Sequence, residues 1–192
     1  MKKTTLTILF IITALSATAQ DKFTKGIRAG VNLSSIYNVG GETKADFYIG
    51  AVGAIKFTRF YTLQPELNYS RQGMNNVPLG RIGDASNSVA EYSDINLNYI
   101  SITVMNKFNL KKFFLQVGPS FDILTKESKY SSNNIDLSAN FGLGMDVTSK
   151  FTIEARYKVG VADLYEQNNY NFFPFDDLNY GSTFQIGGIF KF

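Results

Sequence analysis

The charged side chains on one face of several extended segments are the groups of this sequence that could do chemistry. They are five cations and four anions: Arg28, Lys56, Glu66, Asp122, Asp146, Glu154, Arg156, Lys158 and Lys191. An acid pair such as Glu154 with Asp122 could in principle act as general acid and base. The near balance of signs favours mutual pairing instead, because buried charges need partners. We therefore expect a charge network and no catalytic site.

Two residue types that usually carry enzyme chemistry are absent, since the chain contains no histidine and no cysteine. Their absence removes the usual base of serine hydrolases, thiolate nucleophiles and the commonest metal ligands. The pair Asp176 and Asp177 lacks the regular oxygen-ligand spacing of a calcium loop. We expect neither enzymatic activity nor a cofactor or metal.

The N-terminus has the three parts of a secretory signal peptide. A basic start at Met1-Lys2-Lys3 precedes an apolar core over residues 6–15 and the A-x-A site Ala17-Thr18-Ala19. The apolar core is about half the length of a membrane-spanning helix. We expect a signal peptide over residues 1–19 and one mature domain over residues 20–192. Loss of the two lysines lowers the formal charge of +3 by two, so the charge indicates no nucleic-acid partner.

Apolar residues recur at every second position beyond residue 25, which is the period of a β-strand. Eight such segments are expected, over residues 27–33, 47–57, 63–69, 95–108, 113–123, 137–147, 151–161 and 184–192. The fourth segment changes phase, because Tyr99 and Ile100 belong to opposite parities. A β-bulge near Tyr99 would restore the pattern.

Long and short connections alternate between these segments. Asn-, Ser-, Gly- and Asp-rich stretches cover residues 36–46, 75–94, 126–135 and 163–178, whereas the links near residues 58–60, 109–112 and 148–150 are tight. Transmembrane barrels have short periplasmic turns and long external loops. The fold class is therefore all-β, an eight-stranded antiparallel up-and-down transmembrane β-barrel with both termini in the periplasm.

The polar face decides between this barrel and a soluble barrel whose apolar face encloses a ligand. Glycine, asparagine and serine recur on it, as at Gly30, Asn68, Gly118, Ser120 and Asn140. Glycine weakens a strand, but a narrow eight-stranded lumen has room for little else between larger side chains. We therefore expect the polar face inside and the apolar face toward lipid.

Aromatic residues gather near the ends of the segments, as in the girdles of outer-membrane barrels. The turn-side set is Phe60, Tyr61, Phe113, Phe114, Phe151, Phe190 and Phe192, and the loop-side set is Tyr37, Phe47, Tyr48, Tyr69 and Tyr165. The last long loop adds a candidate contact surface of five aromatics: Tyr165, Tyr170, Phe172, Phe173 and Phe175. The same aromatics could instead pack on the barrel rim.

Several segments together resemble the small outer-membrane β-barrel proteins of Bacteroidetes, called PorT-like or porin-like. The carriers are Gly26 to Asn32, Leu63 to Gly73, Leu97 to Lys107, Phe114 to Ser120, Phe141 to Gly144, Glu154 to Tyr157 and Phe192. Thr103 departs from the family, which often has proline there. The resemblance implies an outer-membrane barrel whose terminal Phe190 and Phe192 act as the signal for the barrel-assembly machinery.

Three functions follow as hypotheses. The first is a structural or interaction protein that contacts an extracellular or envelope protein partner through its external loops. In this hypothesis the protein is a monomer in outer-membrane lipid. The second is a small porin or an accessory part of a secretion complex, although eight strands enclose no wide channel. The third is a lipid-modifying membrane enzyme, which the missing histidine disfavours.

Overall fold

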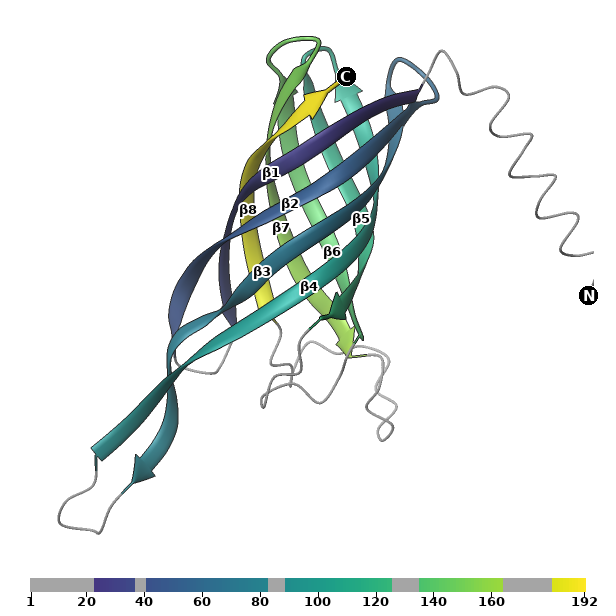
Figure 1. The fold of residues 1–192 in the computed structure, drawn as a ribbon. Helices are drawn as coiled ribbons and strands as arrows, with labels where there is room; N and C mark the ends of the chain where they lie inside the picture. Colours follow the sequence, from purple (N-terminus) through teal and green to yellow (C-terminus); the bar gives the residue numbers. More distant parts are fainter. Residues whose placement is uncertain (1–22, 37–40, 83–88, 126–134, 164–180) are drawn as a thin grey trace, which may run out of the picture.

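The computed structural model describes residues 23–36, 41–82, 89–125, 135–163 and 181–192. It contains eight strands: β1 (Phe23–Ile36), β2 (Glu42–Lys56), β3 (Tyr61–Ile82), β4 (Val89–Leu110), β5 (Phe113–Leu124), β6 (Ile135–Asp146), β7 (Phe151–Asp163) and β8 (Gly181–Lys191). Each strand pairs antiparallel with its neighbour in sequence, and β8 pairs with β1 to close the ring. The predicted eight-stranded up-and-down barrel is therefore confirmed (Figure 1).

The strands alternate between a polar inner face and an apolar outer face. In β5, every second residue from Phe114 to Leu124 is buried, while the residues between them are exposed. The buried set of the barrel is rich in Asn, Gln, Ser and Thr, whereas large exposed side chains such as Leu67, Leu143 and Ile186 cover the outside. This distribution matches the transmembrane arrangement expected from the sequence and is opposite to that of a soluble barrel.

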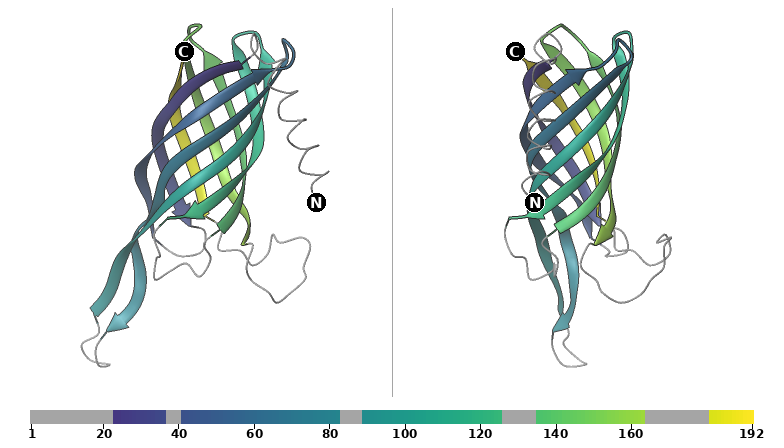
Figure 2. Two further views of the ribbon diagram at one scale, coloured as in Figure 1. Left: turned by 45° about the vertical axis from the view of Figure 1, so that its right-hand side comes forward. Right: turned by 90° about the vertical axis from the view of Figure 1, so that its right-hand side faces the viewer.

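Three tight turns, the start of β1 and the end of β8 lie at one end of the barrel (Figures 1 and 2). The turns after β2 and β6 are built alike, because the hydroxyl oxygens of Thr58 and Thr148 each accept hydrogen bonds from two backbone N–H groups farther along the turn. In the β4–β5 turn, Lys111 takes a positive φ of 61°. We call this end the turn end, and the opposite end the loop end.

The expected loop over residues 75–94 is wrong in its greater part. β3 continues to Ile82 and β4 begins at Val89, so the two strands form a hairpin that projects beyond the barrel at the loop end (Figure 1). Register shifts on β3 between Met74 and Val77 and between Pro78 and Gly80 accompany this extension. Bulges of this kind bend the strand that carries them and increase its twist.

The expected bulge near Tyr99 is also wrong. The β3–β4 register is continuous from Tyr61↔Phe108 to Met74↔Ile95, so Tyr99 and Ile100 lie on opposite faces of an unbroken strand. The change of phase has another cause, since the inner face itself becomes apolar toward the loop end. There Met74, Val77 and Ile95 form a buried cluster against which Leu97 packs.

Among the described residues, no helix has the length and apolar character needed to cross a membrane.

Candidate functional site

The inside of the barrel holds a central charge cluster, which we define as Arg28, Glu66, Lys107, Glu154 and Arg156. These residues come from β1, β3, β4 and β7, and each is at most 5% exposed. Strand alternation directs all five side chains into the lumen, because each has the parity of its strand's inner face. The cluster therefore gathers charges that are far apart in the sequence at one level of the barrel.

The strongest contact of the cluster crosses the lumen from β7 to β3. Arg156 donates to both carboxylate oxygens of Glu66, from Nη1 to Oε2 at 2.8 Å and from Nη2 to Oε1 at 2.7 Å. β3 and β7 are four places apart in a ring of eight, so they face each other across the barrel. Bidentate Arg–carboxylate pairs are among the strongest ionic hydrogen bonds, and this pair braces opposite walls.

Arg28 and Lys107 join the two carboxylates from the sides. The guanidinium of Arg28 lies 3.1 Å from Glu66 and 3.0 Å from Glu154, and it also lies over the ring of Tyr48 at 4.3 Å. Lys107 Nζ lies 3.7 Å from Glu154 and 4.3 Å from the centre of the Phe114 ring. Three cations thus share two carboxylates.

Uncharged amides add hydrogen bonds around the cluster, although Arg156 Nε has no partner among the described residues. Gln64 and Gln116 donate to Glu66 and Glu154, and Gln185 accepts from Arg28 while donating to Asn32. Buried charges are tolerated where their remaining hydrogen-bonding groups find partners. The side chains at this level bridge between strands.

Two further ion pairs join charges that the sequence placed in the lumen network. Lys158 binds Asp122 at 2.7 Å inside the barrel, and Lys191 binds Asp146 at 2.6 Å at the turn end, where both side chains are partly exposed. Eight of the nine charges that the sequence placed in a lumen network thus form ion pairs on the inner face. The exception is Lys56, which is exposed at the end of β2 and has no ion pair among the described residues.

Sequence reasoning missed Lys107 and misplaced two aromatic residues. Lys107 shares its parity with Ile95, Leu97 and Tyr99, which looked like an apolar face in the sequence. Tyr48 and Phe114 were assigned to the outer girdles, but they are 1% and 3% exposed inside the barrel. Each ring lies beside a cation of the cluster, Tyr48 beside Arg28 and Phe114 beside Lys107. An aromatic residue whose parity places it with an inward Arg or Lys was therefore the sequence signal for a ring inside the barrel.

Glycines make room for one of these inner aromatics. Gly30 and Gly187 face each other on β1 and β8, and a Cβ atom on either would approach the Tyr48 hydroxyl to 2.6 Å or less. This close approach explains why glycine stands at inward positions that the sequence analysis assigned to the lumen.

The candidate contact surface at Tyr165, Tyr170, Phe172, Phe173 and Phe175 lies outside the described residues, as does the expected signal peptide. Phe190 and Phe192 are exposed at the turn end. Within the described part of the chain, no group of three or more acidic residues is arranged to hold a metal ion.

Comparisons with known proteins agree with this architecture. The crystal structure of Ail, the attachment invasion locus protein of Yersinia pestis, superposes with a TM-score of 0.51 at 16% identity, over 89% of this chain and 99% of Ail. Neisserial surface protein A gives a TM-score of 0.48 at 15% identity, over 88% of this chain and 97% of that protein. At such identities the likeness concerns the fold alone. A search of curated proteins found no match.

A family model supplies the assignment that these structures cannot. Residues 18–166 match the model described as the outer membrane protein beta-barrel domain. The match covers most of the chain and seven of the eight strands. The chain therefore belongs to the outer membrane protein beta-barrel domain family.

Proposed function

We propose that this integral outer-membrane barrel is a structural or interaction protein with a closed lumen, and that it contacts an extracellular or envelope protein at its loop end. The β3–β4 hairpin is the observation that carries the proposal. It extends the sheet beyond the barrel wall at the loop end (Figure 2).

The hairpin offers an open strand edge. β5 pairs with β4 only from Tyr99 onward, so within the described residues the β4 stretch 89–97 pairs with β3 alone. The Asn98 carbonyl accepts from the Thr125 N–H, which shows that Asn98 directs its backbone groups toward β5. Alternation along the strand then turns the backbone of Asn96, Asp94 and Tyr92 toward the same side, where no described strand pairs with them.

Such an edge can add an extended segment of a partner protein as a further strand. Main-chain hydrogen bonds would supply affinity, and neighbouring side chains would supply selectivity. Tyr92 is 61% exposed on the hairpin, and Asp94 and Asn96 share its face. The partner we propose is therefore an extended protein segment that meets this aromatic and polar face.

The experiment is photo-cross-linking in cells with a benzophenone amino acid at Tyr92. Its matched control carries the same group at Phe113, which is also 61% exposed but lies at the turn end. We expect a discrete protein adduct from position 92 and none from position 113. Equal adduct patterns from both positions, or no adduct from position 92, would contradict the interaction role.

The porin alternative has less support, because the central charge cluster bridges opposite walls at one level. Eight-stranded barrels have interiors that side chains fill. Purified protein in planar bilayers should give no large, stable conductance steps. Such steps would replace the closed-lumen proposal with a channel function.

The remaining proposals concern the cellular location of the protein and its orientation in the membrane. Export by a signal peptide over residues 1–19 and a mature domain over residues 20–192 rest on the N-terminal sequence. Periplasmic termini and assembly guided by Phe190 and Phe192 are consistent with the tight turns at that end and with the exposure of both phenylalanines. A PorT-like, Bacteroidetes affiliation and an accessory role in a secretion complex rest on resemblance. An outer-membrane fraction should contain a heat-modifiable monomer on gels, whereas free periplasmic protein would overturn this set.

A further inference from the structure

A cation followed directly by phenylalanine recurs at the turn end. The pairs are Arg59-Phe60, Lys112-Phe113, Lys150-Phe151 and Lys191-Phe192, and the β2–β3 turn begins with one more, Lys56-Phe57. The first three stand in or beside the β2–β3, β4–β5 and β6–β7 turns, and the fourth stands at the end of β8. The pairs are thus spaced two strands apart around the whole ring.

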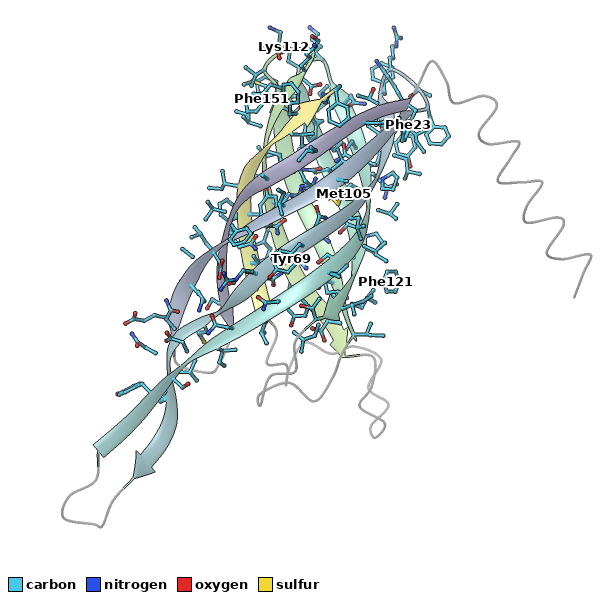
Figure 3. All side chains as sticks on the ribbon, viewed as in Figure 1. Phe23, Tyr69, Met105, Lys112, Phe121 and Phe151 are labelled. Carbon is cyan, nitrogen blue, oxygen red and sulfur yellow. The ribbon has the colours of Figure 1, made fainter. Side chains whose placement is uncertain are left out.

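The phenylalanines of the first four pairs are exposed, at 59%, 61%, 41% and 66% in chain order. Figure 3 shows Lys112 and Phe151 at the end of the barrel where Phe23 also lies. The Arg59 guanidinium lies over the Phe60 ring at 4.7 Å, so this pair is held together. Aromatic rings at this level suit the boundary between acyl chains and headgroups. Arg59, Lys112 and Lys150 lie one step farther out than the phenylalanines that follow them, because each precedes a strand that runs into the barrel.

Three further cations give the turn end a marked excess of positive charge. We define the turn-end collar as the pairs of the three turns and Phe192, together with Lys25, Lys56 and Lys111, all three of which are exposed; Lys191 is left out because it belongs to the inner face. Among the described side chains of this end, Asp146 is the acid, and it binds Lys191. The other six cations have no ion pair within the described residues.

The loop end lacks this bias. Its described charged side chains mix both signs, as with Glu42, Lys44, Asp46 and Arg71, and Arg71 lies 3.4 Å from Asp46. The excess of unpaired cations is therefore a property of one end rather than of the whole surface.

We propose that the turn-end collar binds the phosphates of anionic phospholipids in the leaflet around the tight turns. The inference rests on the proposed function only in requiring that the barrel spans a bilayer. Even spacing favours lipid over a single acidic partner, because lipid surrounds a barrel whereas a docked protein covers one side. The alternation of exposed phenylalanine with cations matches the two chemistries of a lipid, acyl chain and phosphate.

The test compares two double variants with equal loss of charge. K111Q/K112Q removes two collar cations, and K44Q/R71Q removes two cations at the loop end. Each protein is folded into phosphatidylcholine nanodiscs with a minor fraction of phosphatidylglycerol, and native mass spectrometry measures the phosphatidylglycerol retained. We expect retention to fall about fivefold for each collar cation removed, and high salt to have the same effect.

Each outcome has a definite meaning. Equal losses in both variants, or no preference for phosphatidylglycerol in the wild type, would overturn the proposal. Binding of purified peptidoglycan or of an acidic protein through Lys111 and Lys112, without lipid preference, would also overturn it. A heat-modifiability gel on the same samples separates these results from failure of the barrel to insert, which would count against the proposed function itself.

Discussion

At the scale of single residues, the carboxylate of Glu66 holds the inner surface together. It accepts hydrogen bonds from both Nη groups of Arg156 and from Nη1 of Arg28, and its side chain is fully buried. Removing one partner of a buried ion pair is strongly destabilising, because the remaining charge is left without compensation. Here two guanidinium groups and Lys107 would be left with the single carboxylate of Glu154.

Glu66→Gln should therefore lower the free energy of unfolding by about 3 to 5 kcal/mol. The measurement is urea unfolding in lipid vesicles, followed by tyrosine fluorescence and gel shift. Asp46→Asn is the control, because Asp46 pairs with the partly exposed Arg71 at 3.4 Å, where about 0 to 1 kcal/mol is expected. Equal effects of the two substitutions would mean that the cross-lumen contact contributes no particular stability.

The turn residue Thr148 gives a second residue-scale prediction. Its hydroxyl oxygen accepts hydrogen bonds from the backbone N–H groups of Lys150 and Phe151, at 3.2 and 2.9 Å. Thr148→Val keeps the shape of the side chain and removes the hydrogen-bond acceptor. The free energy of unfolding in the same urea assay should therefore fall by about 1 kcal/mol. Ser149→Ala changes the next, exposed residue and should have little effect. A null result for Thr148→Val would show that water replaces the hydroxyl fully.

At the scale of elements, strand number, order and facing were predictable, because a period of two repeated over eight segments leaves few alternatives. The ends of the strands were less predictable. Residues 75–94 are rich in Asn, Gly and Ser, which favour loops, yet pairing between β3 and β4 carries the strands to Ile82 and from Val89. The apparent phase error at Tyr99 has the same origin, since an apolar inner cluster supports the hairpin.

That cluster predicts how the hairpin can be loosened without unfolding the barrel. Ile95 is 6% exposed and packs with Met74 and Val77 where the hairpin leaves the barrel. Ile95→Asn should raise amide hydrogen exchange over residues 77–82 and 89–95 by about tenfold, through local opening. Exchange in β7 and β8 should not change.

Tyr92→Asn serves as the control for the hairpin, because Tyr92 is exposed on the same strand. Its exchange pattern should match that of the wild type. Acceleration throughout the barrel in Ile95→Asn would show instead that the hairpin and barrel unfold as one unit.

The candidate site was predictable in its chemistry and less so in its arrangement. Balanced charges on an inward face imply pairing, and eight of the nine charges do pair. Which ones meet depends on strand tilt and register, which bring Glu66 of β3 to Arg156 of β7 across the lumen. The tilt and register of the strands cannot be derived from the sequence. Lys107 was missed because the residues of its own parity, Ile95, Leu97 and Tyr99, looked like an apolar face.

At the scale of the whole molecule, the exposed apolar surface decides what surrounds the barrel. Ile186 is the middle residue of β8 and is 52% exposed, whereas Leu110 ends β4 at the turn end and is 59% exposed. In a bilayer, arginine near the midplane costs about 2 to 4 kcal/mol, and near the interface about 0 to 1. In water, both substitutions would replace an exposed apolar side chain with a soluble one.

Ile186→Arg should therefore destabilise the barrel in vesicles by about 2 kcal/mol or more, while Leu110→Arg should change its stability little. The measurement is reversible urea unfolding in short-chain lipid vesicles, with both variants also unfolded in detergent micelles, where the difference should shrink. Because the two positions have similar exposure, the difference between them reports depth rather than burial within the protein. Equal tolerance of arginine at both positions would mean that the apolar belt does not lie in the hydrocarbon core.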